Sequence, residues 1–337
     1  MDIGKLGEFG LINRLTGDIK PVQPSTIKGI GDDAAILRYG DAVLAVTTDM
    51  MVEGIDFDLT YVPLQHLGYK AAIVGFSDLY AMNVAPRQLL VSIAVSAKFS
   101  VEALERLYQG LRLACGRHQV DLVGGDTTPS VTGLAITVTA IGEADPATIT
   151  YRNTAQKGDL ICVSGDLGAA YMGLQALERE KKLFGEDPTL QPQLEKYTYV
   201  VGRQLKPEIR RDIIDFFKSS GLLPTSMIDI SDGLSSDLLH ICTSSGVGCE
   251  IHHHKIPIAE ETEAAAEEFF LDPLITALNG GDDYELLFTI PVSDYDKVLR
   301  NSNISIIGYI TDQKEGCHLV TGDGTKIEIR AHWKDER

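Results

Sequence analysis

The chain has 337 residues and a formal net charge of −18, with 44% hydrophobic and 23% charged residues. This length and apolar content suffice for about two globular domains. The acidic balance argues against nucleic acid or an anionic membrane as the main partner, because both attract basic surfaces. The sequence has no apolar run of the length that a membrane span needs and no signal-peptide pattern at its N-terminus, so we expect neither.

Taken in chain order, hydrophobic periodicity predicts an alternation of strands and helices in the first half. The expected strands are 34–37, 42–47, 88–97, 120–123 and 134–141, and the expected helices are 64–83 and 101–118. The chain then turns polar over 142–158, where it contains Pro146. This change of composition predicts a boundary between an N-terminal domain, 1–150, and a C-terminal domain, 151–337.

The second half again alternates between the two kinds of element. The expected strands are 160–164, 227–230, 248–252 and 284–290, and the expected helices are 169–179, 208–219, 233–244, 264–278 and 293–299. Pro207 precedes one helix, where proline favours the first turn. Ser231 and Asp232 stand where they could cap another. The pattern as a whole predicts an α/β protein.

The five cysteines are odd in number, and their spacings match no zinc or redox motif. Cys115 and Cys162 lie in apolar runs. We therefore expect reduced, mostly buried thiols in a cytoplasmic protein.

Aspartates beside glycines or hydroxyl-bearing residues recur along most of the chain. The segments are Gly31-Asp32-Asp33, Thr47-Thr48-Asp49, Ser77-Asp78, Gly124-Gly125-Asp126, Asp229-Ile230-Ser231-Asp232-Gly233 and Gly280-Gly281-Asp282-Asp283. Each Gly-Asp pair alone is equally typical of a turn. Gathered in one place, carboxylates repel one another unless cations lie between them. Oxygen ligands of this kind suit several Mg²⁺ ions, which proteins commonly gather to handle a polyphosphate.

Two of these aspartates are hard to explain as turn residues. Asp78 lies in a helix that is small and apolar nearly all round, and a buried carboxylate without a cation costs several kcal/mol. Lys70 lies two turns away along that helix, too far for a simple pair, so a metal partner is favoured. Asp229 interrupts an apolar strand, whereas capping alone would explain Asp232.

Common nucleotide motifs are absent from the sequence, which contains no P-loop, no Gly-x-Gly-x-x-Gly and no protein-kinase signature set. The run His252-His253-His254 resembles a metal tract. Successive strand residues face opposite sides, however, so three adjacent histidines cannot share one ion.

Together the segments resemble the thiamine-monophosphate kinases, a family in the superfamily of aminoimidazole ribonucleotide synthetase. The resemblance covers nearly the whole chain and is carried by Gly7-Glu8-Phe9, Gly29 to Ala35, Thr47 to Gly54, Ser77-Asp78, Gly124 to Thr127, Lys157 to Leu160, Asp229 to Leu234 and Gly280 to Leu286. It implies a two-domain α/β (α+β) fold of the aminoimidazole ribonucleotide synthetase type. The N-terminal sheets of two subunits would form a barrel in a homodimer, and the C-terminal α/β domain would complete the active site.

The resemblance also implies a reaction, the transfer of phosphate from ATP to thiamine monophosphate in the last step of thiamine diphosphate synthesis. It implies several Mg²⁺ ions. Because the nucleophile would be a phosphate oxygen that is already anionic near neutral pH, we also expect direct in-line transfer with no general base and no covalent nucleophile. The implied metal ligands are Asp32, Asp33, Thr47, Thr48, Asp49, Asp78, Asp126, Asp229 and Asp232. The implied ATP contacts are Tyr108, Gly125, Asp126, Arg152 and Ser231, and the implied substrate contacts are Asp56, Glu285 and Trp333.

The chain departs from the family pattern at Asp56, where many relatives have a substrate-binding histidine. An acid there could instead face the cationic thiazolium ring. Trp333, the sole tryptophan, could stack on that cation or pack a C-terminal tail.

Other functions remain open at this point. A selenophosphate synthetase would need a reactive cysteine near the N-terminus, but the first cysteine is Cys115. The hydrogenase-maturation relatives end in a cysteine-bearing tail, which 333–337 lacks. An aminoimidazole ribonucleotide synthetase is the nearest enzymatic alternative, and a protein that binds Mg²⁺-ATP without turnover is the alternative outside the enzymes.

Overall fold

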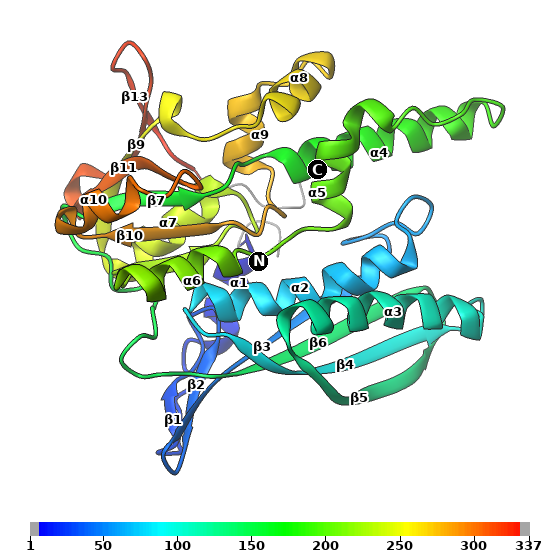
Figure 1. Ribbon diagram of the computed structural model, residues 1–337, viewed down its shortest axis with the longest axis horizontal. Helices are drawn as coiled ribbons and strands as arrows, with labels where there is room; N and C mark the ends of the chain where they lie inside the picture. Colours follow the sequence, from blue (N-terminus) through cyan, green and yellow to red (C-terminus); the bar gives the residue numbers. More distant parts are fainter. Residues whose placement is uncertain (1–6, 331–337) are drawn as a thin grey trace.

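The computed structural model describes residues 7–330, without the side chains of residues 7–9 and 13. Two mixed sheets, each with its own helices, make up an α/β architecture (Figure 1). No helix in this described part of the chain is both long and apolar enough to cross a membrane.

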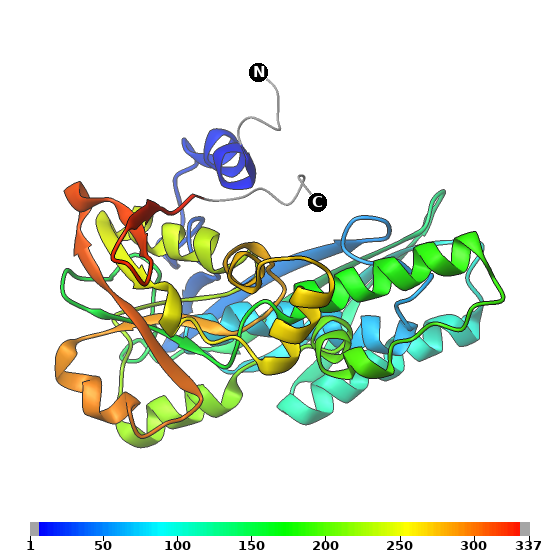
Figure 2. The same ribbon diagram turned by 90° about the horizontal axis from the view of Figure 1, so that it is seen from above.

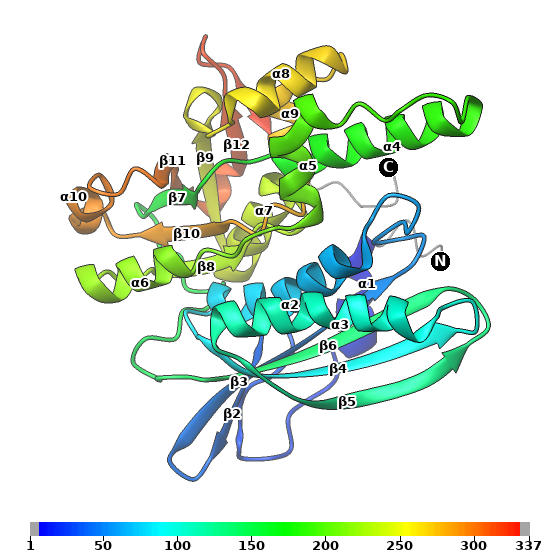
Figure 3. The ribbon, with the colours of Figure 1, turned by 45° about the vertical axis from the view of Figure 1, so that its right-hand side comes forward.

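The first sheet has six strands in the order β1-β2-β3-β6-β4-β5. The strands are β1 (Thr26–Lys28), β2 (Ala35–Tyr39), β3 (Ala42–Val52), β4 (Pro86–Ser96), β5 (Asp121–Ser130) and β6 (Leu134–Glu143). Helices α2 (Leu64–Ala81) and α3 (Val101–His118) cover one face, and the opposite face is open (Figure 3). The alternation along β3 follows from this arrangement, because Val43 and Ala45 are buried while Met50 is 63% exposed.

Helices α2 and α3 touch through their backbones at two glycines. A Cβ added at Gly68 would lie 1.9 Å from the carbonyl oxygen of Leu107, and one at Gly110 would lie 1.9 Å from that of Gln65. Any larger side chain would push the helices apart. The close approach explains why α2 is rich in small residues, and it fixes the height of α2 above the sheet.

The second sheet has seven strands in the order β13-β12-β9-β11-β7-β10-β8. The strands are β7 (Leu160–Ser164), β8 (Ser226–Asp229), β9 (Val247–His252), β10 (Leu286–Ile290), β11 (Ile304–Asp312), β12 (Cys317–Val320) and β13 (Lys326–Glu328). Its edge strand β8 packs against α2. Helix α2 therefore lies between the two halves and contacts both (Figures 1 and 3).

Eight further α-helices are present in residues 7–330. They are α1 (Gly7–Thr16), α4 (Ala169–Glu186), α5 (Thr198–Leu205), α6 (Arg211–Ser220), α7 (Leu234–Ser245), α8 (Glu260–Glu268), α9 (Pro273–Asn279) and α10 (Tyr295–Val298). Seen from above, α1 stands apart from the two sheets (Figure 2). Helices α1 and α5 had no counterpart among the sequence-based expectations.

Most predicted elements are present, and two have the predicted bounds, α3 and β7. The predicted strand 120–123 was too short, because β5 continues through Gly124 and Gly125 to Ser130. Glycine at 125 permits close pairing there, since a Cβ would lie 1.7 Å from the carbonyl oxygen of Val91. Gly125 therefore serves strand pairing, and neither Gly124 nor Gly125 ends the strand.

Other boundaries were wrong too, and helix α4 continues to Glu186 beyond its predicted end at 179. Helix α6 begins at Arg211 and not directly after Pro207. The predicted helix 264–278 is two helices, α8 and α9, separated by a turn in which Phe270 has a φ of 57°. Strand β3 continues beyond the predicted residue 47 to Val52, so the Thr47-Thr48-Asp49 segment lies inside the strand and not at its end.

We predict opposite effects of alanine at two glycines of α3. Gly110→Ala should lower the free energy of unfolding by at least about 2 kcal/mol, because the methyl group meets backbone atoms of α2. Gly116→Ala should raise it by roughly 0.5–1 kcal/mol, because that exposed position has space and alanine favours the helix. Urea unfolding of both variants checks this, and equal effects would contradict the backbone contact.

Candidate active site

Three aspartates from separate elements meet where the two halves join. Asp33 precedes β2, Asp78 lies on α2, and Asp229 ends β8. Each offers a carboxylate oxygen, and these three oxygens lie within 4.8 Å of one another. The structure therefore brings these three predicted carboxylates together, although Asp33 and Asp229 are 196 positions apart in the sequence.

Neighbouring hydroxyl groups orient two of these carboxylates. Thr47 of β3 donates a hydrogen bond to Asp78, and Ser77 of α2 donates one of 2.5 Å to Asp229. Asp49, two residues beyond Thr47, faces the same side of β3, because a Cβ added at Gly75 of α2 would lie 3.6 Å from its Oδ2. The period of two in a strand thus directs Thr47 and Asp49 toward α2.

Burial and mutual repulsion raise the pKa values of these acids. Burial, together with Asp229 and Asp32, raises the pKa of Asp33 to about 7 against the opposing effect of Arg152. Burial and Asp33 raise the pKa of Asp49 to about 6. Burial likewise raises the pKa of Asp229 to about 6, with a contribution from Asp49, and that of Asp78 well above its ordinary value. The cluster carries more negative charge than its surroundings compensate.

Two basic side chains compensate part of the charge. Arg152 lies 2.6 Å from Oδ1 of Asp33 and 3.8 Å from Oδ1 of Asp32. Lys28 lies 3.3 Å from Oδ2 of Asp32, whose side chain is fully buried. Asp33 therefore holds the Arg152 side chain, while Asp32 pairs with Lys28 and accepts a 3.2 Å hydrogen bond from the backbone amide of Arg152.

The donor set fits divalent cations that prefer oxygen. Oδ2 of Asp33 and Oδ2 of Asp49 are buried and have no hydrogen-bond partner among the described residues. Buried carboxylate oxygens are normally paired, and hard cations such as Mg²⁺ take such oxygens as ligands. The residues that would hold them are Asp33, Asp49, Asp78 and Asp229.

A second group of possible ligands lies at the start of α7 and includes two residues that the sequence did not indicate. Ligand atoms of Asp232, Asp237 and His240 lie within 4.8 Å of one another. Asp237 also accepts hydrogen bonds from the backbone amides of Asp232 (3.2 Å) and Gly233 (3.1 Å). The predicted cap by Ser231 or Asp232 is replaced by this arrangement, with Gly233 as the N-cap residue. The spacing of three between Asp237 and His240, which places both on one helix face, was the available signal.

The second Gly-Asp-Asp segment has a structural role. Asp282 pairs with Lys70 at 3.2 Å, which gives that buried lysine the partner it lacks within its own helix. Asp283 accepts hydrogen bonds from the amides of Gly168 (2.8 Å) and Ala170 (3.5 Å) at the start of α4. Helix N-termini favour such carboxylates.

A cleft of about 1890 Å³ leads to the cluster. Ligand pockets commonly measure about 300–1,000 Å³, so this one has room for two ligands side by side. Ile12 of α1 and Thr243 of α7 line its walls. Ser231 and Asp56 also line it. Asp56 is exposed, and its Oδ2 accepts a 2.7 Å hydrogen bond from the amide of Val52.

Several predicted site residues are not part of the carboxylate cluster. Thr48 lines the cleft, but its hydroxyl contacts Val138 and Thr139 of β6, on the opposite side of β3 from Asp49. Glu285 is buried and pairs with Arg203 at 3.1 Å and Arg210 at 2.8 Å. The described lining of the cleft does not include Tyr108, Gly125, Asp126 or Glu285. Trp333 lies outside the described residues. The predicted roles of these residues stay predictions.

Comparison with known proteins gives consistent matches over the whole chain. The family model for the N-terminal domain of AIR synthase related proteins matches residues 31–144, and that for the C-terminal domain matches residues 156–319. The chain is 33% identical to a thiamine-monophosphate kinase of Aquifex aeolicus, over 99% of both chains. It is 30% identical to one of Bacillus subtilis, over 96% of this chain and 97% of the relative. A solved structure described as AaThiL complexed with AMPPCP and TMP superimposes with a TM-score of 0.82 at 31% identity, covering 98% of each chain.

The raised pKa values predict how stability depends on pH without metal. Because Asp33, Asp49 and Asp229 have folded-state pKa values of about 7, 6 and 6 against 3.8, the folded state binds more protons than the unfolded chain between about pH 4 and 7. The stability of the metal-free protein should therefore fall as the pH rises through this window. For Asp49 alone the difference corresponds to on the order of 3 kcal/mol.

Thermal unfolding in EDTA between pH 5 and 8 measures this dependence. Asp49→Asn should flatten it and stabilise the metal-free protein at pH 8, whereas Asp41→Asn, at an exposed turn, should leave it unchanged. Added Mg²⁺ should stabilise the protein more at pH 8 than at pH 5. A stability that increases with pH in EDTA would contradict the buried repulsion.

Proposed function

Because this chain belongs to the thiamine-monophosphate kinase family of AIR synthase related proteins, we propose that it transfers the γ-phosphoryl group of ATP to thiamine monophosphate and releases thiamine diphosphate and ADP. Relatives that carry this name align with it from end to end. The similar solved structure is described as a complex with AMPPCP and TMP, in keeping with a two-ligand cleft.

The observation that carries the proposal is the carboxylate cluster at the inner end of the cleft. Asp33, Asp78 and Asp229 present oxygens within 4.8 Å of one another, and Oδ2 of Asp49 is buried without a partner among the described residues. Mg²⁺ held by these oxygens would neutralise the charge of two phosphorylated ligands that otherwise repel each other. We propose more than one ion, because the possible ligands form two separate groups. One group contains Asp33, Asp78 and Asp229, and the other contains Asp232, Asp237 and His240.

The chain's own residues would position the substrates. Arg152 reaches the cluster from beside Asp33 and can also contact a phosphate. Ser231, which lines the cleft between Asp229 and Asp232, is a second proposed ATP contact. Asp56 stands exposed along the cleft, where its negative charge would favour a cationic ring. Contacts of Glu285 and Trp333 with the substrate are proposed from the family resemblance alone.

No general base or covalent nucleophile is required by this chemistry. An oxygen of thiamine monophosphate, already anionic near neutral pH, forms the new bond to the γ-phosphorus while the bond to the leaving oxygen of ADP breaks. The protein contributes alignment and electrostatic stabilisation. We therefore propose direct in-line transfer, and a trapped phosphorylated residue on the protein would contradict it.

A homodimer is proposed from the open face of the first sheet. Met50 and Val123 are 63% and 54% exposed there, which leaves apolar surface for a second copy to cover. In the sheet, Asp126 on β5 pairs with Ser92 on β4, which pairs with Thr137 on β6, which pairs with Met50 on β3. Asp126 and Met50 are therefore three strand spacings apart, a separation of about 14 Å. Within one copy Asp126 is therefore remote from Asp49, and a partner's Asp126 would supply the predicted ligand.

A cytoplasmic location is also proposed, consistent with five free thiols.

The first test is the reaction itself. We expect thiamine diphosphate to form from ATP and thiamine monophosphate with Mg²⁺ and not with EDTA, read directly by chromatography. Asp49→Asn should lower turnover on the order of 100-fold or more with the fold retained, because it removes a charge that orders the phosphates. Asp41→Asn is the matched control and should keep full activity. If folded protein binds Mg²⁺-ATP but makes no product, the acceptor is wrong.

The second test asks whether the site is shared between copies. Asp49→Asn and Asp126→Asn homodimers should each be inactive. A purified heterodimer of the two variants would contain one intact site, so its activity should recover to about half that of the wild-type dimer. If Asp126 acts within its own copy, both sites of the heterodimer carry a substitution and the activity stays lost.

A further inference from the structure

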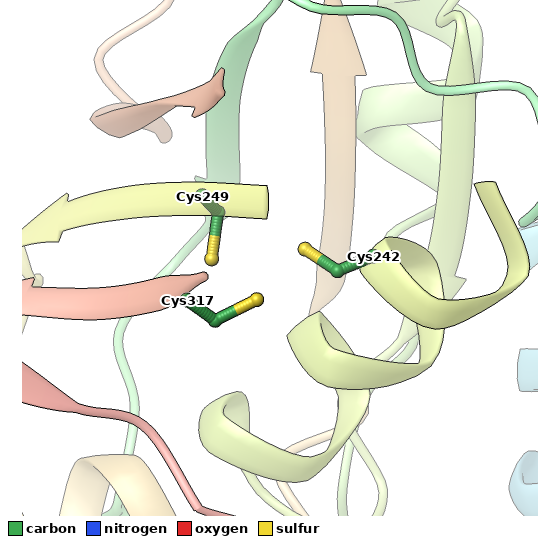
Figure 4. A group of neighbouring side chains, drawn as sticks. All are labelled: Cys242, Cys249 and Cys317. Carbon is green, nitrogen blue, oxygen red and sulfur yellow. The ribbon is translucent and has the colours of Figure 1, made fainter. Parts of the chain in front are cut away.

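Three cysteines converge in the second half, away from the carboxylate cluster. Cys242 lies on α7, Cys249 on β9 and Cys317 on β12. Their sulfur atoms lie within 4.8 Å of one another, and Figure 4 shows all three pointing into one space. The remaining cysteines, Cys115 and Cys162, belong to other packing clusters.

The backbone arrangement sets this geometry. Strands β9 and β12 are parallel neighbours in which Cys249 and Cys317 are direct partners, so their side chains share one face of the sheet. Helix α7 packs on that face and buries Cys242 against the same core as Cys249. The opposite side of α7, including His240 and Thr243, lines the cleft. The cysteines and the acidic cleft therefore lie on opposite sides of one helix.

We propose that Cys242, Cys249 and Cys317 form a binding site for one thiophilic d10 metal ion of the Zn²⁺ or Cu⁺ type. With metal–sulfur distances of about 2.3 Å, three sulfur atoms around one ion lie about 3.8–4.0 Å apart. The observed limit of 4.8 Å requires movements of about 1 Å or less. Soft thiolate ligands select such ions, whereas Mg²⁺ prefers oxygen. The cysteine site and the carboxylate site would therefore bind different metals.

Access and charge also support the site. Cys242 and Cys249 are buried, but Cys317 is half-buried and gives an ion a way in. Neighbouring Cys242 and Cys249 lower the pKa of the Cys317 thiol, which favours the thiolate form that metals bind. Metal binding displaces the remaining thiol protons to solvent.

The coordination number follows from what surrounds the sulfurs. Within residues 7–330, no histidine or carboxylate joins the three sulfurs in the same group. His318 follows Cys317 directly on β12 and so projects from the other face of the sheet. Three protein ligands leave Cu⁺ three-coordinate and Zn²⁺ with a fourth position on the half-buried side of Cys317.

The test uses the full-length, reduced protein in saturating Mg²⁺ without oxygen. Zn²⁺ and Cu⁺ are titrated separately against a competing chelator, and X-ray absorption counts the sulfur neighbours of the bound ion. We expect one ion per chain with three sulfur neighbours. Uptake of Zn²⁺ alone, Cu⁺ alone or both identifies the ion and supports the site.

Variants separate the site from ordinary buried thiols. Cys317→Ser and Cys242→Ser should weaken binding by more than about 100-fold, because even second-sphere changes cost about 10–100-fold. Cys115→Ala, a buried thiol outside the cluster, should bind like the wild type. Phosphoryl transfer should persist in Cys317→Ser.

A measurement on the unmutated protein guards against variants that fail to fold. The bound ion should protect Cys317 from alkylation, located by mass spectrometry, and should raise the unfolding temperature. The proposal is overturned if reduced protein takes up neither ion, if Cys317→Ser binds as well as the wild type, or if the ion has only oxygen and nitrogen neighbours.

Discussion

Electrostatic repulsion among buried carboxylates is the constraint on which the rest of this structure depends. Asp33, Asp78 and Asp229 present oxygens within 4.8 Å of one another, and burial together with neighbouring aspartates raises their pKa values. Arg152 compensates only part of the charge. The fold maintains this arrangement through contacts elsewhere, and the resulting affinity for cations is what makes the junction between the halves a site for phosphorylated ligands.

Helix α2 is the element that maintains it. Its glycines bring it against α3, its flank packs on β3, and its neighbour on the other side is β8. Two consecutive residues of α2 then bond to different halves. Asp78 accepts a hydrogen bond from Thr47 in the first half, and Ser77 donates one to Asp229 in the second. A shift of this helix would separate the carboxylates, which links the packing of small residues directly to the chemistry of the site.

Helix α7 has a comparable position in the second half. Asp237 near its start supports the acidic end of the cleft, while Cys242 near its end faces two strands and their cysteines. Oxygen and sulfur donors thus occupy opposite faces of one helix. A thiophilic ion on the sulfur side would fasten α7 to β9 and β12, and so would stabilise the wall of the cleft without entering it.

The sequence by itself determined the α/β class, the boundaries of α3 and β7, and the aspartates that gather at the junction. It did so because hydrophobic periodicity is local and because Asp78 and Asp229 interrupt apolar segments that have no other use for a charge. The two family models and full-length relatives agree with the family that those segments resemble.

Only the tertiary structure decided which acids face the site. Asp32 and Asp33 are adjacent, yet only Asp33 joins Asp78 and Asp229 in the cluster, whereas Asp32 pairs with Lys28. Asp282 and Asp283 repeat the same Asp-Asp sequence, but Asp282 forms an ion pair with Lys70 and Asp283 accepts a hydrogen bond at the start of α4. The cysteines are 75 positions apart at the extremes and match no spacing motif, but strand register and helix packing bring them together. The local sequence pattern cannot predict such contacts, because they depend on which elements far apart in the chain become neighbours in the fold.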